Sequence, residues 1–119
     1  KEEYTRKVED YLAKSSASPF QNLQWLVLEY LQCLYSVDYC FLIDMQQGRE
    51  LSNGNNEFKH FWLKIIAATL QKCCGNNAVN IGLFTKNLIE IINRSRIDGV
   101  PKDEQEGFID IMLRGITIF

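Results

Sequence analysis

The residues of this sequence that could bind a metal are one histidine and four cysteines. They are His60, Cys33, Cys40, Cys73 and Cys74. A structural zinc site needs four ligands at short spacing, usually as two close pairs. Cys73 and Cys74 with His60 offer three ligands at the wrong spacing, and no C-x-x-C pair occurs. We therefore expect neither a metal nor a cofactor in this chain.

A catalytic cysteine would need a histidine within hydrogen-bond reach of its sulfur. His60 lies 13 residues before Cys73, which is about 20 Å along one helix at 1.5 Å per residue. Cys33 or Cys40 could approach His60 only through tertiary folding, and no catalytic motif flanks either of them. We expect His60 to be a partly exposed side chain beside aromatic neighbours.

Four carboxylates gather near the C-terminus, directly after Pro101. They are Asp103, Glu104, Glu106 and Asp110. Acidic residues in the first turn of a helix complement its dipole, and proline at the first position favours a helix start. These residues therefore predict a helix N-terminus rather than acid–base catalysis. No glycine-rich phosphate loop occurs, so the sequence predicts no enzyme.

Charge is segregated along the chain. Residues 15–48 carry three acidic and no basic residues, whereas residues 49–97 carry seven basic and three acidic ones. Lys64 and Lys72 are eight residues apart and so share one side of a helix. The basic side chains that could extend this side are Lys86, Arg94 and Arg96. Such a ridge indicates either an ordinary solvated face or contact with acidic residues of a partner protein, and the alternative is nucleic acid, chiefly RNA.

Hydrophobic periodicity predicts about six antiparallel helices joined by short connections. They cover approximately residues 2–15, 19–36, 38–47, 56–74, 78–95 and 101–115. A strand over 39–45 is the alternative for the third. Shifting the sequence by 39 residues pairs Leu23 with Trp62 and Leu31 with Leu70, which is close to the period of HEAT-type helix pairs. The sequence thus predicts an all-α fold, either a compact bundle or HEAT-like pairs.

The apolar faces of three predicted helices define the core. Trp62 belongs to the clearest stripe, in the fourth helix. The fifth helix is expected to bury Ile81, Phe84, Leu88, Ile91 and Ile92. The last helix is expected to bury Phe108, Ile109, Ile111, Met112 and Leu113.

The helix over 19–36 organises the chain. Ser18 precedes Pro19, and Gln21 completes a capping box at its start. The helix is apolar around most of its circumference, so it must be covered on more than one side. A side left uncovered would form a groove for a partner helix or peptide. The residues expected to contact that partner are Trp25, Leu28, Tyr35, Lys64 and Lys72.

Length and composition are those of one globular domain. The chain has 119 residues, 46% hydrophobic and 24% charged, with a net charge of −2. We expect residues 1–119 to form a single helical domain cut from a longer protein. The apolar window 19–45 is interrupted by polar residues such as Glu29, Asp38 and Asp44, so no membrane span is predicted.

Reduced cysteines indicate an intracellular protein of the cytoplasm or nucleus. The alternative is a secreted helical protein with two disulfides, which the sequon over residues 93–95 would suit. Together, the observations favour a non-catalytic interaction domain, a scaffold or adaptor that binds a helix or peptide of another protein. Its oligomeric state is open at this point.

A count of free thiols tests the prediction of reduced cysteines. The denatured chain should react with four equivalents of a thiol reagent without prior reduction, because no cysteine is expected in a disulfide. A count of zero would establish two disulfides and favour the secreted alternative.

Overall fold

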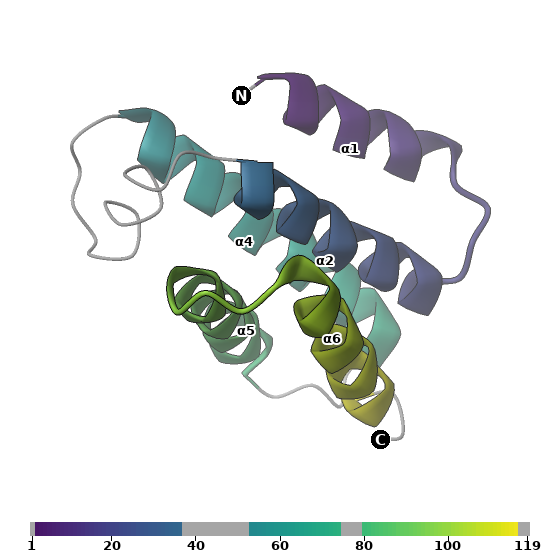
Figure 1. Ribbon diagram of the computed structural model, residues 1–119. Helices are drawn as coiled ribbons and strands as arrows, with labels where there is room; N and C mark the ends of the chain where they lie inside the picture. Colours follow the sequence, from purple (N-terminus) through teal and green to yellow (C-terminus); the bar gives the residue numbers. More distant parts are fainter. Residues whose placement is uncertain (1, 37–52, 75–79, 117–119) are drawn as a thin grey trace.

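Five α-helices make up the part of the chain that the structure, a computed structural model, describes: residues 2–36, 53–74 and 80–116. They are α1 (Glu2–Lys14), α2 (Pro19–Ser36), α4 (Asn53–Cys74), α5 (Ile81–Ile97) and α6 (Lys102–Ile116) (Figure 1). The predicted all-α class is confirmed for these residues. The helix expected over 38–47, and the rival strand over 39–45, lie outside the described residues.

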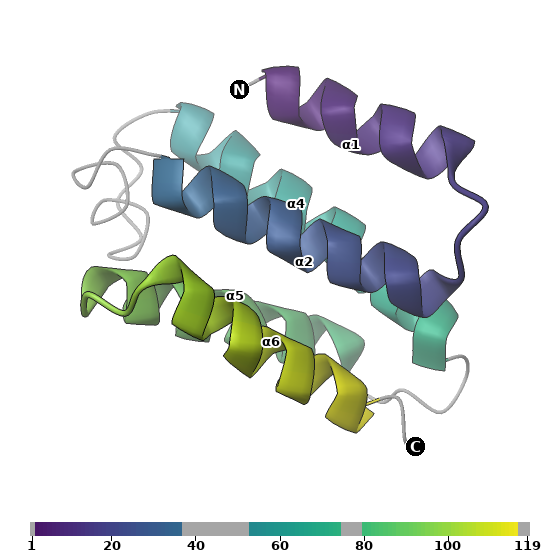
Figure 2. The ribbon, with the colours of Figure 1, turned by 45° about the vertical axis from the view of Figure 1, so that its right-hand side comes forward.

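The helices form a bundle around α2. Successive helices reverse direction along the chain, and in Figure 2 α4 lies behind α2 while α5 lies behind α6. Each of the other four helices packs against α2. In a stack of helix pairs each repeat contacts only its neighbours, so this arrangement favours the bundle over HEAT-like pairs.

The start of α2 follows the predicted capping box. The Gln21 backbone N–H donates to Ser18 Oγ at 3.2 Å, and the Ser18 N–H donates to Gln21 Oε1, also at 3.2 Å. Two backbone donors that have no partner within the helix are thereby satisfied. The last helix begins at Lys102, one residue after the proline that signals it.

The turn between α5 and α6 makes these two helices a hairpin. Gly99 adopts a φ of 90°, a conformation that glycine reaches without the steric cost that a Cβ would impose. The Val100 N–H donates to the Ser95 carbonyl at 3.0 Å and the Gly99 N–H donates to the Arg96 carbonyl at 3.1 Å. These bonds end α5 in the manner of a glycine C-cap. Only four residues, 98–101, then separate the helices, so α6 returns alongside α5.

The core consists of apolar side chains from all five described helices, with α2 as the largest contributor. Its fully buried residues include Leu23, Leu26, Val27, Tyr30, Leu31 and Leu34. Aromatic rings from three helices meet beside them. The Trp62 ring lies 5.5 Å from Tyr30 and 5.9 Å from Tyr4, between ring centroids. This aromatic cluster joins α1, α2 and α4 and confirms the predicted buried position of Trp62.

One polar contact crosses the core. The Tyr30 hydroxyl donates a hydrogen bond to Asn93 Oδ1, and both residues are buried. Burial also raises the pKa of Tyr30, so its hydroxyl stays protonated and remains a donor. Because each polar group satisfies the other, the bond fixes the height of α5 against α2.

Three residues expected in the core are instead exposed. Ile91, Phe108 and Ile111 are 43%, 46% and 73% exposed, respectively. The buried stripe of α6 runs through Gln105, Ile109 and Leu113, so its other side cannot also face the core. The sequence prediction was wrong for these three residues because the last two helices lie at the edge of the bundle, where each has a free side.

Replacement of Trp62 by alanine tests the aromatic cluster. Trp62→Ala should lower the free energy of unfolding by about 3–5 kcal/mol, because it removes a fully buried ring and leaves a cavity. Urea denaturation followed by circular dichroism measures this loss. Gln71→Ala, an exposed position on the same helix, is the control and should change stability by less than about 0.5 kcal/mol. Equal stabilities of the two variants would contradict the placement of α4.

Candidate functional site

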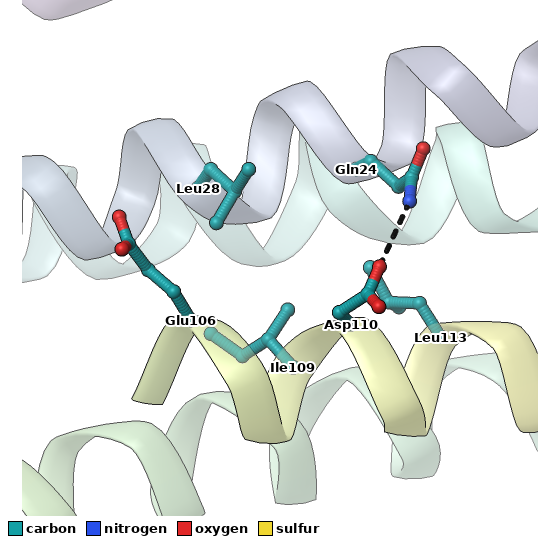
Figure 3. Close-up of a pocket in the computed structure, with 6 residues that line it drawn as sticks. All are labelled: Gln24, Leu28, Glu106, Ile109, Asp110 and Leu113. Carbon is teal, nitrogen blue, oxygen red and sulfur yellow. Dashed lines mark hydrogen bonds between the residues drawn. The ribbon is translucent and has the colours of Figure 1, made fainter. Parts of the chain in front are cut away.

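A groove runs between α2 and α6, on the side of α2 that the other helices leave open. Its lining residues are Gln24 and Leu28 from α2 and Glu106, Ile109, Asp110 and Leu113 from α6 (Figure 3). The volume of the groove is about 290 Å³. Leu28 is 41% exposed, whereas Ile109 and Leu113 are buried. Ile109 and Leu113 therefore form an apolar base that belongs to the core, and Leu28 continues this apolar surface out to the solvent.

The rim of the groove is acidic. Gln24 Nε2 donates to Asp110 Oδ1 at 3.4 Å across the groove. Arg114 Nε donates to the other oxygen of Asp110 at 3.0 Å, and Lys102 Nζ lies 3.2 Å from Glu106 Oε2. Both ion pairs are exposed i,i+4 pairs, which contribute only about 0.3–0.5 kcal/mol each. A cation on a binding partner could replace either one at little cost.

Trp25 lies on the side of α2 that faces α1, away from the groove. Its ring stacks on Tyr11 with centroids 3.8 Å apart and planes 4° apart. A second hollow of about 410 Å³ lies there, lined by Lys7, Asp10, Tyr11, Lys14, Ser15 and Trp25. Lys7 Nζ is 2.9 Å from Glu29 Oε2, and this ion pair raises the pKa of Lys7. Trp25 thus holds α1 against α2, with one ring face committed to Tyr11.

Tyr35 joins α2 to the hairpin of α5 and α6. Its hydroxyl donates to the Val100 carbonyl at 2.5 Å and accepts from Gln105 Nε2 at 2.9 Å. Gln105 Nε2 also donates to the Ile92 carbonyl at 3.0 Å. The Arg96 guanidinium lies 5.1 Å from the centroid of the Tyr35 ring, a cation–π distance. These contacts occupy both the ring and the hydroxyl, so Tyr35 acts as a connector between helices.

Lys64 and Lys72 lie on α4, and both are exposed. Within the described ranges, neither has a carboxylate within 4.0 Å. The basic ridge does not extend far from them. Arg96 faces Tyr35, and Glu90 lies between the basic residues of α5 with its carboxylate 4.0 Å from Lys59 Nζ.

The five predicted contact residues therefore do not form one site. Leu28 lines the groove between α2 and α6, Trp25 and Tyr35 hold helices together, and the two lysines belong to α4. Sequence reasoning missed the acidic rim and the contribution of α6. A signal was present, because residues 106, 109, 110 and 113 recur at helical spacing. Nothing in the sequence states which helix lies opposite that face.

The described cysteines and the sequon bear on the alternatives left open above. Cys33, Cys73 and Cys74 are free thiols. Burial raises the pKa of Cys33 and of Cys73, so both thiols are poor nucleophiles near neutral pH. Asn93 is 1% exposed and accepts the Tyr30 hydrogen bond. A glycan could not be attached to it in the folded chain. Cys40 lies outside the described residues.

Two further kinds of feature are absent from the described residues, a metal-binding cluster and a membrane-spanning helix. Among the described residues, no group of three or more His, Cys, Asp or Glu side chains could hold a metal ion. No helix in the described ranges is long and apolar enough to cross a bilayer. Comparisons of the chain with protein families, curated proteins and solved structures return no match.

Removing the Tyr35 hydroxyl tests its connecting role. Tyr35→Phe should lower the free energy of unfolding by about 1–2 kcal/mol, because the Val100 carbonyl and the Gln105 amide lose a partner at a half-buried site. The matched control is Tyr11→Phe, which keeps the stacking on Trp25 and removes a hydroxyl with no hydrogen bond among the described residues. Chemical denaturation of both variants measures the difference, and similar losses would contradict the connecting role.

Proposed function

We propose that this domain is a non-catalytic protein–protein interaction module, a scaffold or adaptor that binds a helix of a partner protein. The observation that carries the proposal is Leu28, a large apolar side chain exposed on the central helix at an apolar groove. Grooves of this kind, with an apolar base and a polar rim, accept the apolar face of an amphipathic helix. The exposed leucine is then buried by the partner.

The chemistry of the rim specifies the partner further. Ile109 and Leu113 at the base favour leucine-like or aromatic anchors at i and i+3 or i+4 spacing. Glu106 and Asp110 favour lysine or arginine beside those anchors. The partner proposed is therefore a basic amphipathic helix. An acidic helix would place like charges together at the rim, which disfavours binding.

Nucleic acid is less well supported as a partner. The exposed lysines of α4 are few, and the acidic Glu90 interrupts the basic residues of α5. The aromatic residues close to Lys64 in sequence are Phe61 and Trp62, which pack against the core and in it, respectively. They cannot stack on bases without unfolding the helix. The proposed site of action is the cytoplasm or nucleus, because the cysteines of the described ranges are free thiols.

Replacement of Leu28 by glutamate tests the groove. Peptides selected for binding from a displayed random library should be enriched in basic amphipathic helices. Leu28→Glu should weaken the binding of such a peptide at least tenfold, because it places a charge against the apolar anchor. Fluorescence anisotropy of a labelled peptide measures the affinity. Leu28 is already 41% exposed, so the variant should fold normally.

Gln32→Glu is the matched control for charge. It lies one turn along α2, is also exposed, and does not line the groove. The affinity of this variant for the labelled peptide should remain within about twofold of that of wild type. NMR shifts on peptide addition should change at Gln24, Leu28 and Leu113. Equal affinities for the two variants, or shifts confined to α1, would refute the groove as the binding site.

A further inference from the structure

The α5–α6 hairpin carries four large exposed apolar residues, none of which belongs to the buried stripes of the two helices. Leu83 and Ile91 of α5 are 58% and 43% exposed, and Phe108 and Ile111 of α6 are 46% and 73% exposed. In Figure 2 the α5–α6 hairpin forms the lower edge of the molecule, with no other labelled helix below it. We call these residues the hairpin patch.

The spacing of the patch is that of a helix–helix seam. On α6, Glu104, Phe108 and Ile111 recur at intervals of four and three residues, and on α5, Leu83, Ile91 and Arg94 lie on one side at intervals of eight and three. The steps of four and three on α6, and the step of eight on α5, which is slightly more than two turns, keep these residues on one side of each helix. Isolated exposed apolar residues are common on protein surfaces, whereas a seam that continues across two adjacent helices indicates a partner made of helices.

The charges of the hairpin indicate which helices a partner would place against the patch. The basic residues of α5 are Lys86, Arg94 and Arg96, against a single acidic Glu90. The acidic residues of α6 are Asp103, Glu104, Glu106 and Asp110, against Lys102 and Arg114. The two helices thus carry opposite net charge. Glu106 and Asp110 line the groove, and Arg96 faces Tyr35, so the charges beside the hairpin patch are Arg94 and Glu104. A second copy matches these two charges when its α6 lies on α5 of the first copy.

We propose that the hairpin patch is a homodimer interface in which two copies of the chain pair their hairpins into a four-helix bundle. The two-fold axis runs along the hairpins, so that α5 of each subunit packs on α6 of the other. Every helix in this bundle then has antiparallel neighbours, which is the usual geometry of four-helix bundles. An interface of this type is self-complementary, as a two-fold dimer requires.

One ion pair fixes the register of the proposed dimer. The bond from Gln105 Nε2 to the Ile92 carbonyl places residues 105 and 92 at the same height in the hairpin. By helical rise, Glu104 then lies near the height of Arg94, and Phe108 near that of Ile91. In the dimer Arg94 would meet Glu104 of the partner subunit. Among the described residues, neither side chain has an opposite charge within 4.0 Å in the monomer.

The surface of α5 also offers a place for an apolar side chain of the second copy. A hollow of about 340 Å³ is lined by Glu90, Ile91, Arg94 and Ser95. Phe108 of the partner subunit lies at the matching height and presents a ring that would enter it. The packing of a side chain from one helix into a hollow of the next is the standard contact of such bundles.

The area of the patch sets the expected affinity of the dimer. A 15-residue helix such as α6 is about 22 Å long at 1.5 Å per residue, and two helices side by side span about 20 Å. The contact area is then about 450 Å² per copy, roughly half of the 800 Å² typical of a stable complex. We therefore expect a concentration-dependent dimer in the micromolar range. The groove between α2 and α6 lies on another side of α6, so it stays open in the proposed dimer.

Analytical ultracentrifugation of the whole chain tests the proposal. Between about 5 and about 500 μM protein the average mass should rise from the 13.8 kDa of the monomer towards twice that value. Ile111→Ser should weaken association at least tenfold. Because Ile111 is 73% exposed, this variant should keep the circular dichroism spectrum and the thermal stability of wild type.

A charge reversal tests the register. Arg94→Glu and Glu104→Arg should each weaken the dimer at least fivefold, and the double variant should regain affinity within about twofold of wild type. Lys64→Glu on α4 is the control and should leave association unchanged. A monomeric mass at every concentration, full association of Ile111→Ser, or a double variant no better than the single ones would each overturn the proposal. Leu28→Glu should still dimerise, so this result and the peptide result are independent.

Discussion

The burial of α2 is the constraint on which the rest of this structure depends. Its sequence is apolar on most of its circumference, and no single neighbour could cover it. All four other described helices pack against it. Two of those contacts carry directional chemistry as well as apolar area. Tyr30 is bonded to Asn93 of α5, and Tyr35 is bonded to the α5–α6 turn and to Gln105. The hairpin is thereby held at a defined height against α2.

That constraint also explains where the exposed apolar surface lies. Four neighbours cover α2 except along one strip, where Leu28 reaches the groove beside α6. The helices α5 and α6 lie at the edge of the bundle and pack on the core with one side only. Their remaining apolar residues therefore face solvent. The groove and the hairpin patch are two consequences of the same packing, and α6 borders both of them. Glu106 and Asp110 line the groove, whereas Glu104 lies beside the patch.

The extent of successful prediction differs between local and long-range features. The capping box of Ser18 and Gln21 was predicted correctly because each of its bonds spans three residues. Trp62 was placed correctly because its stripe leaves only one side of α4 apolar. Phe108 and Ile111 were misplaced because α6 is apolar on two sides, and periodicity alone cannot tell which side faces the core. Trp25 and Tyr35, which were expected to contact a partner, each contact another helix of the same chain, which the sequence did not indicate.

The sequence by itself determined the helical class, the starts of α2 and α6 and the identity of the central helix, whereas α4 and α5 begin at Asn53 and Ile81, three residues from the predicted starts. Those features follow from interactions between residues a few positions apart and from the apolar content of one segment. Only the tertiary structure decided that Gln24 and Leu28 face Asp110 and Leu113 across a groove, with the carboxylates of Glu106 and Asp110 on its α6 side. Contacts between residues more than eighty positions apart depend on how the bundle closes. That closure is set by the sum of many packing contacts, so no local pattern in the sequence encodes it.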